Sequence, residues 1–322
     1  MWVKKLFFTA IVLFQVHPAF CWGFFAHKLI NQYAIFLLPP EMMVLYKPSI
    51  AFITEHAVDP DKRRYAVKEE GPRHYIDLDH YKPWDSIPWQ FSKAIEKYSE
   101  DSLQKHGIGP WWIQTMMSRL TRAFSEKDKF RIIKLSAELG HYVADLHVPL
   151  HASSNHNGQY TNQQGIHGFW ESRIPELLAE KEFDFIIGKA AYVSSPAQLI
   201  WKVALQSGAS ADTVLLLERQ LSMGYRPDQK YSFELRNGII VKQYSSAYSI
   251  AYHNLLNGMV ERRMRQSVQA IASLWFTAWV NAGQPDLTSL ANKSFTEAEL
   301  KEWDELNAPL PANPITGRSC TN

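Results

Sequence analysis

Residues 140–171 read GHYVADLHVPLHASSNHNGQYTNQQGIHGFWE, and they carry potential metal ligands on both sides of a polar loop. His141 and Asp145 are four residues apart, as are His167 and Glu171. Side chains at this spacing lie on one face of a helix, so each pair could bind one metal ion. Because imidazole and carboxylate are ligands that zinc accepts, the stretch predicts a metal site between two helices.

The loop between these helices adds a further candidate ligand. His151 follows Pro149, just beyond the expected end of the first helix. A single histidine is more often a packed or surface residue than a ligand, so the prediction rests on the clustering. His147 lies six residues after His141 and points to another side of the helix, and we interpret it as a packing or supporting residue.

The chain begins with a segment that we expect to be a secretory signal peptide, residues 1–21. Two lysines precede an apolar run that is too short to span a bilayer. Cleavage before Trp22 would export the protein to the periplasm or the exterior, and a lipid anchor on Cys21 is the alternative. Residues 22–283 would form one domain without a transmembrane segment, followed by a polar C-terminal extension over 284–322.

Charge and cysteine content narrow the function classes. The chain has 34 Lys and Arg against 32 Asp and Glu, and loss of the two signal-peptide lysines would leave these counts equal. A balanced charge gives no support to tight electrostatic binding of nucleic acid. Only Cys320 would remain after cleavage, so no internal disulfide is expected, and the core or bound metal must stabilise the fold.

The hydrophobic pattern predicts an all-α fold, a single-domain helical bundle that encloses its site. Apolar residues recur at helical spacing over residues 22–38 and almost throughout from Pro88 onward. The segment 59–88 has no clear period and is expected to be irregular. The best strand-like alternation, FELRNGIIV at 233–241, is short.

Nine positions in the first half of the chain resemble a known superfamily. They are Trp22, His27, Asp59, His74, His141, Asp145, His151, His167 and Glu171. Their order and spacing resemble those of the zinc-dependent phospholipases C and the single-strand-specific zinc nucleases. The resemblance implies a helical bundle of that type, with three zinc ions at the bottom of a cleft.

The resemblance also implies which residues would hold each ion. One zinc would be bound by Asp59, His74, His141 and Asp145. A second would be bound by the free amine and carbonyl oxygen of Trp22, by His27 and by Asp145, which would bridge the two ions. The third would be bound by His151, His167 and Glu171.

Features of both branches of the superfamily are present, so the substrate stays open. Trp22 followed five residues later by His27 resembles the nucleases, whereas Glu171 resembles the phospholipases. The stretch 153–165 lacks the Gly-Gly-Asn loop expected of a nuclease. We predict a secreted zinc-dependent phosphodiesterase with a slight preference for phospholipids or other small phosphodiesters. The alternative is an endonuclease on single-stranded DNA or RNA that also has 3′-nucleotidase activity.

Three residues have expected roles in the reaction. Asp59 would orient the attacking water or take its proton. Tyr75 would contact the substrate, with packing beneath the irregular segment as the alternative. The α-amine of Trp22 can bind zinc only when it is free, so signal-peptide cleavage would complete the site.

Two other interpretations are weaker. Glu138 and His141 form one Glu-x-x-His pair of the kind found in di-iron bundles, but those need a second pair, which the sequence lacks. A non-catalytic, metal-stabilised module would fill every coordination position of its metals. Ligands drawn from several separated segments and holding three ions side by side argue against such a module.

Overall fold

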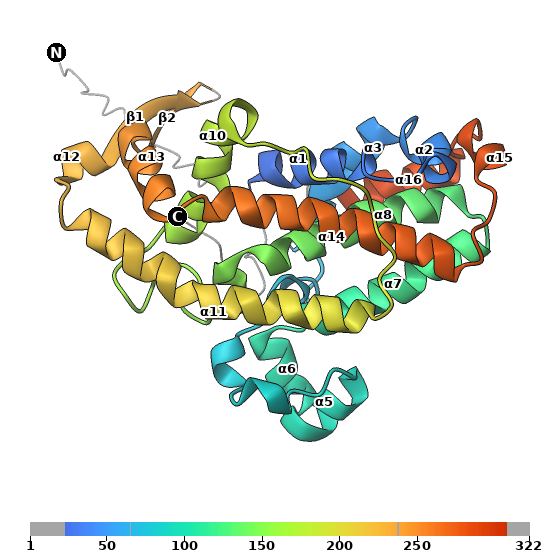
Figure 1. The fold of residues 1–322 in the computed structure, drawn as a ribbon, viewed down its shortest axis with the longest axis horizontal. Helices are drawn as coiled ribbons and strands as arrows, with labels where there is room; N and C mark the ends of the chain where they lie inside the picture. The colour runs from blue at the N-terminus through green and yellow to red at the C-terminus, as the bar shows by residue number, and fades with distance from the viewer. Residues whose placement is uncertain (1–22, 65, 237, 308–322) are drawn as a thin grey trace, which may run out of the picture.

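The computed structural model describes residues 23–64, 66–236 and 238–307, which are predominantly helical (Figure 1). The longer helices are α1 (Phe24–Ile35), α7 (Gly109–Ser125), α8 (Lys129–His147), α11 (Pro196–Ser222) and α14 (Met259–Asn281). Helix α8 contacts the other four and forms the centre of the bundle. The predicted predominance of helix is confirmed for this part of the chain. None of the helices in the described ranges is long and apolar enough to cross a membrane.

Shorter elements surround this bundle. The helices are α2 (Pro40–Tyr46), α3 (Ile50–Glu55), α4 (Asp59–Arg63), α5 (Phe91–Tyr98), α6 (Glu100–His106), α9 (Ile166–Gly168), α10 (Ile174–Glu182), α12 (Pro227–Lys230), α13 (Ser246–Leu255), α15 (Thr288–Ala291) and α16 (Glu297–Asn307). Strands β1 (Tyr231–Arg236) and β2 (Ile239–Tyr244) form an antiparallel hairpin, the one sheet in the described part of the chain. The hairpin contains the FELRNGIIV stretch, where the sequence alternates as a strand does.

Helix α8 begins and ends where its sequence directs. The side chain of Asp128 accepts a hydrogen bond from the backbone N–H of Arg131 and so caps the first turn. Every side chain from Ser136 to His147 is buried. The helix ends at His147 because the residue before Pro149, Val148, takes an extended conformation.

A close approach between α1 and α8 occurs at Gly140. A Cβ atom at this position would collide with the side chain of Asn31 on α1. Asn31 is buried, and its Nδ2 donates a hydrogen bond to the carbonyl oxygen of Ala137, at 3.0 Å. Gly140 therefore allows α1 to lie close to α8, which brings His27, one turn before Asn31, against His141.

One region differs in detail from the sequence prediction. The helical pattern continues through residues 89–107, but the chain breaks between α5 and α6 at Ser99, which has a φ of 66°. The hydroxyl of Ser99 accepts a hydrogen bond from the N–H of Ser102 and caps α6. The segment 59–88 is largely irregular, as predicted, apart from α4 and short 3-10 turns.

Part of the predicted C-terminal extension packs against the bundle. Leu290 of α15 and Trp303 of α16 are buried. The indole of Trp303 contacts the rings of Phe52 and Phe130, with centroid distances of 4.6 and 5.8 Å. The predicted signal peptide and Trp22 lie outside the described residues, and the domain boundaries stay predictions.

Candidate metal centre

Buried histidine and carboxylate side chains converge beside the C-terminal half of α8. They come from α1, α4, α8, α9, the 3-10 turns Gly71–His74 and Pro149–Ala152, and a π-helical turn over Phe169–Arg173. Their side chains are His27, Asp61, His74, His141, Asp145, His151, His167 and Glu171, and none is more than 3% exposed. Burying so many ionisable groups is costly unless they pair with one another or bind a metal ion.

The first group consists of His74, His141 and Asp145. Asp145 Oδ2 lies 2.8 Å from His74 Nδ1 and 3.2 Å from His141 Nε2, and these two ring nitrogens are 3.1 Å apart. His141 Nδ1 donates to the carbonyl oxygen of Ala57, at 2.8 Å, so the neutral ring presents the lone pair of Nε2 to the group. Asp61 Oδ1 lies 3.7 Å from the same nitrogens of both histidines.

The second group consists of His151, His167 and Glu171. The Nε2 atoms of the two histidines are 3.1 Å apart and lie 3.4 and 3.0 Å from Glu171 Oε2. Zinc with ligand distances of about 2.0–2.1 Å needs tetrahedral donors separated by about 3.3 Å. The spacing of the three donor atoms therefore fits a zinc ion without rearrangement of the chain.

Backbone carbonyls fix both rings of the second group. His151 Nδ1 donates to the carbonyl oxygen of His74, at 2.6 Å, and His167 Nδ1 donates to that of His156, at 3.1 Å. Since a carbonyl can only accept, each Nδ1 carries a proton, and the two Nε2 atoms face each other across the position left for a shared proton or a cation. Two facing lone pairs repel unless a proton or a cation lies between them.

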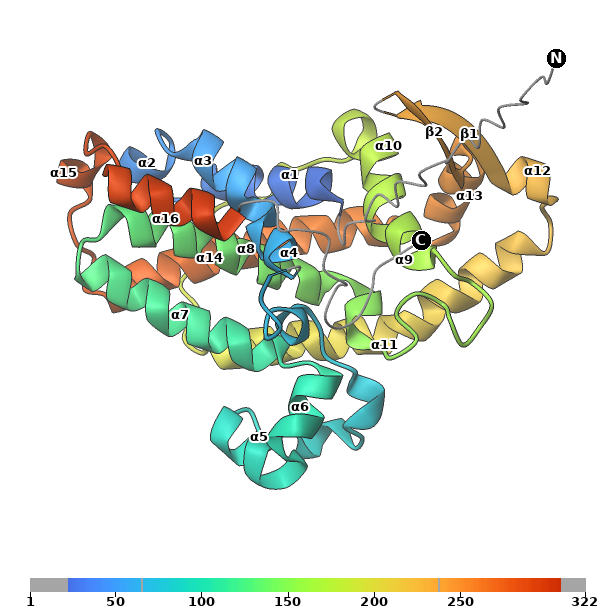
Figure 2. The same cartoon turned by 180° about the vertical axis from the view of Figure 1, so that it is seen from behind.

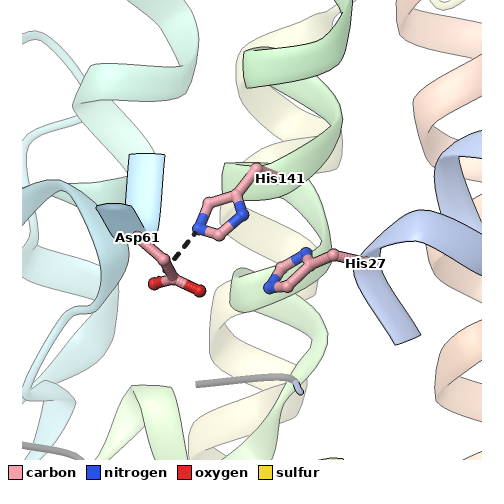
Figure 3. A group of neighbouring side chains, drawn as sticks. All are labelled: His27, Asp61 and His141. Carbon is pink, nitrogen blue, oxygen red and sulfur yellow. Dashed lines mark ion pairs between the residues drawn. The ribbon is translucent and has the colours of Figure 1, made fainter. Parts of the chain in front are cut away.

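The third set is built around His27. Its Nε2 lies 3.3 Å from Asp145 Oδ1, and its ring stacks on that of His141 with centroids 3.9 Å apart. Figure 3 shows His27, Asp61 and His141 pointing toward one another from three separate segments. Asp145 Oδ1 also lies 3.8 Å from His151 Nε2, so this carboxylate lies between all the groups.

The N-terminal end of the described chain lies beside this centre. The backbone N–H of Gly23 donates to the hydroxyl of Ser172, at 2.9 Å. Ser172 directly follows Glu171 in the π-helical turn. The residue before Gly23, the predicted ligand Trp22, lies outside the described residues.

The structure does not bring Asp59 into this centre. Asp59 accepts hydrogen bonds from His56 Nδ1, at 2.7 Å, and from Lys62 Nζ, at 2.9 Å. Asp61 lies beside His74 and His141 in the position assigned to Asp59 by sequence (Figure 2 shows α4 beside α8). Residues two apart on a helix point about 200° from each other, so only one of these carboxylates can face the histidines.

The neighbouring histidines favour the ionised forms of Glu171 and Asp145. Burial alone would raise the pKa of Glu171, but the charges and hydrogen bonds of His167 and His151 lower it below its ordinary value. Burial likewise opposes ionisation of Asp145, yet His141, His151 and the other histidines hold its pKa well below the usual range. Burial lowers the pKa of His151, but Asp145 and Glu171 raise it to about 9. A metal ion entering this centre would displace protons from the histidines.

Residues that the sequence analysis missed support the ligands. Glu70 Oε1 lies 3.5 Å from His74 Nε2, and Arg73 pairs with the other oxygen of Glu70, at 2.7 Å. The four-residue spacing from Glu70 to His74 was the available signal. Asn157 Oδ1 accepts a hydrogen bond from the N–H of Gly165, at 2.9 Å, and positions the turn before His167. His147 points away from the centre, and its Nδ1 donates to the carbonyl oxygen of Val143.

A cavity of about 850 Å³ lies next to the centre. Its lining includes Tyr75, which directly follows His74, and His156, whose carbonyl oxygen fixes His167. Tyr75 is mostly buried, and its hydroxyl donates to the carbonyl oxygen of Lys105, at 3.2 Å. The predicted substrate residue therefore lies in a wall of this cavity.

Asp77, His80 and His106 form a more exposed group on the same cavity. His106 Nδ1 lies 3.4 Å from Asp77 Oδ2. The rings of His80 and His106 stack with centroids 3.8 Å apart and an angle of 27° between their planes. Because ring lone pairs lie in the ring planes, two nearly parallel stacked rings do not direct them at one ion, in contrast to His151 and His167, whose planes differ by 57°.

Comparison with known protein families gave no match to this chain, and a search of curated proteins gave none.

Proposed function

We propose that the protein is an exported zinc-dependent phosphodiesterase that hydrolyses phosphate ester bonds. The observation that carries this proposal is the pair of facing Nε2 atoms of His151 and His167, 3.1 Å apart beside Glu171. Both rings already donate their other N–H to a carbonyl oxygen. The arrangement suits a cation, and its ligand types and spacing suit zinc.

Three ions are proposed, as the resemblance implies. The first would be held by Asp61, His74, His141 and Asp145, the second by His27 and Asp145 together with Trp22, and the third by His151, His167 and Glu171. Both oxygens of Asp61 accept no hydrogen bond from the described residues, which leaves them available as ligands.

The chemistry of the site follows from these residues. Bound zinc lowers the pKa of water toward about 7 and neutralises the negative charge of a phosphodiester. The chain holds the donor atoms in place, because Ala57, His74 and His156 fix three imidazole rings through backbone carbonyls. Asp61 takes over the role predicted for Asp59, that of orienting the attacking water and accepting its proton at a carboxylate oxygen.

The preferred substrate class is a phospholipid or another small phosphodiester. The cavity beside Tyr75 has room for one head group. Acidic residues Glu100 and Asp101 line it together with Lys68 and Lys105, so its charge is mixed. A mixed charge suits a zwitterionic head group better than a long polyanion.

A separate observation favours the second candidate, a single-strand nuclease. A basic cavity of about 1000 Å³ is lined by Trp112, with the guanidinium of Arg73 4.0 Å and that of Arg119 4.9 Å from its ring centroid. Stacking platforms with cations are typical of single-strand binding. Several cations of this cavity are already paired with carboxylates, among them Arg63 with Glu138 and Lys134 with Glu302. We therefore propose a phospholipid as the preferred substrate and single-stranded nucleic acid as the second candidate.

One assay panel tests the proposal. Zinc-loaded mature protein is incubated with phosphatidylcholine, single-stranded DNA and RNA, each with and without a chelator, and its metal content is measured by mass spectrometry. We expect hydrolysis of phosphatidylcholine that stops with the chelator and returns with zinc. Turnover of DNA or RNA alone would select the nuclease. Full metal content without turnover of any substrate would contradict the proposed enzymatic activity.

A further inference from the structure

The β1–β2 hairpin exposes large apolar side chains. Phe233, Leu235 and Ile240 are 74%, 73% and 70% exposed, and Ile239 at the turn is 45% exposed. Soluble proteins seldom leave such side chains together on a sheet face that faces water. A contiguous apolar surface of this kind marks a site of interaction.

The strand register places Phe233, Leu235 and Ile240 on one face, whereas Ile239 pairs with Arg236 and lies on the other face. Leu235 pairs with Ile240, and Phe233 pairs with Lys242. Alternate residues point the other way, and Glu234 on that face pairs with Arg173, at 2.7 Å. The hairpin thus has a polar inner face held to the protein and an apolar outer face edged by a lysine.

The hairpin is anchored to the segment that supplies a metal ligand. Arg173 Nε donates to the carbonyl oxygen of Tyr244, at 3.1 Å, and the Tyr244 ring stacks on Phe169 with centroids 3.8 Å apart. Phe169 and Arg173 bound the π-helical turn that contains Glu171. Figure 1 shows the hairpin at one edge of the molecule, beside α10 and α13.

Charge on the hairpin favours a negatively charged partner. Residues 230–244 contain one carboxylate, Glu234, which Arg173 neutralises. Lys230 and Arg236 pair with Glu218 and Glu176, at 2.6 and 2.7 Å, so Lys242 on the outer face is the cation that a partner would meet. Tyr231 and Tyr244 lie at the base of the hairpin, with Lys242 Nζ 4.1 Å from the Tyr231 ring centroid. An apolar face followed by tyrosines and a lysine matches the order of layers at a membrane surface.

We propose that the hairpin docks the protein on a phospholipid membrane, with its apolar face in the interfacial layer and Lys242 against the head groups. A second copy of the chain is a poorer occupant. The three apolar side chains on this face, exposed by 70–74%, present roughly 400 Å² if a large side chain offers about 150–250 Å², whereas a stable interface needs about 800 Å² from each partner. Docking would bring the π-helical turn that contains Glu171 close to the membrane, because the hairpin is anchored to that turn. The suggestion that docking delivers substrate rests on the proposed phospholipase activity.

Vesicle sedimentation tests the docking apart from catalysis. Mature protein is mixed with vesicles of phosphatidylcholine and phosphatidylglycerol in the presence of a chelator, and bound protein is measured. The triple variant Phe233→Ser, Leu235→Ser and Ile240→Ser should bind about tenfold less tightly or worse. Ile186→Ser, which removes an apolar side chain 86% exposed outside the hairpin, is the matched control and should bind as the wild type does.

The outcomes separate the two proposals. Equal binding of wild type and triple variant, or no binding by the wild type, would overturn the docking. A hairpin-dependent dimer without vesicle binding would overturn it in favour of a second copy. Turnover of the soluble bis(4-nitrophenyl) phosphate by zinc-loaded protein should be the same in all three proteins. If the wild type does not hydrolyse this substrate, the proposed phosphodiesterase activity is contradicted, but the conclusion from vesicle binding is unaffected.

Discussion

Gly140 on α8 lies directly against the buried side chain of Asn31 on α1. Substitution Gly140→Ala forces Asn31 to move and to lose its bond to Ala137, so we expect unfolding free energy to fall by about 1–3 kcal/mol. Binding of metal near His27 should also weaken. The double variant Asn31→Ala with Gly140→Ala removes the obstacle and should be less destabilised than the sum of the single variants. Additive losses in denaturant titrations would contradict this packing.

Asp61 and Asp59 differ in their expected effect on metal content. Asp61→Asn should lower the bound zinc by one ion per chain and the hydrolysis rate by about 100-fold, because a neutral amide is a weaker ligand and base. Asp59→Asn, the matched control two residues away, should keep its full metal content. Mass spectrometry of the purified variants decides between them. Loss of zinc from the Asp59 variant alone would restore the sequence assignment.

Removal of zinc should destabilise the fold. Without cations, the buried histidines and carboxylates must be balanced by protons, and the stabilisation by ligand binding is lost. Chelation should therefore lower the melting temperature of the wild type more than that of Asp145→Asn, since this variant would hold only the ion bound by His151, His167 and Glu171. Calorimetry with and without a chelator measures both. An equal shift in the two proteins would exclude Asp145 as a ligand.

An added residue before Trp22 should reduce the number of bound metal ions by one per chain. The α-amine of Trp22 would become an amide, which has no lone pair for zinc at neutral pH. We expect the metal content of protein that begins Ala-Trp to fall by one per chain, whereas replacement of the signal peptide by another that is cleaved at the same bond should leave it unchanged. Full metal content in the extended protein would remove the terminal amine from the centre.

Acid should destabilise the metal-free protein through His147. Burial and the neighbouring Arg263 charge lower the pKa of His147 to about 3. The unfolded chain binds a proton below about pH 6.5 whereas the folded chain does not, so stability falls as the pH drops from about 6.5 toward 3, by about 2 kcal/mol between pH 7 and 5. His147→Gln keeps a donor and should lack this part of the loss. Chelator-treated proteins in urea titrations provide the comparison, and identical pH profiles would contradict the assignment.

Local sequence spacing predicted much of the fold and part of the centre. His141 with Asp145 and His167 with Glu171 do face each other, at 3.2 and 3.0 Å, because i, i+4 geometry is a property of the helix itself. The choice between Asp59 and Asp61 depends on how α4 is rotated against α8. That rotation is set by tertiary contacts. The sequence alone therefore could not decide which of the two aspartates faces the histidines.

Other features also depended on distant contacts. The break at Ser99 requires a left-handed conformation that the helical pattern of residues 89–107 does not reveal. Trp303 is buried because it finds Phe52, far away in sequence, although its own segment is polar. The π-helical turn around Glu171 likewise lies where Phe169 meets Tyr244. These features depend on residues that are far away in the sequence, so the local sequence pattern does not predict them.

The position of Asp145 affects how the centre would fill when zinc is scarce. One of its oxygens faces His74 and His141, and the other faces His27 and His151. Two ions that share one carboxylate would repel each other, so the proposed centre should bind the second ion of this pair more weakly than the first. When zinc is scarce, that ion would leave before the other, and the rate would fall while part of the metal content remained.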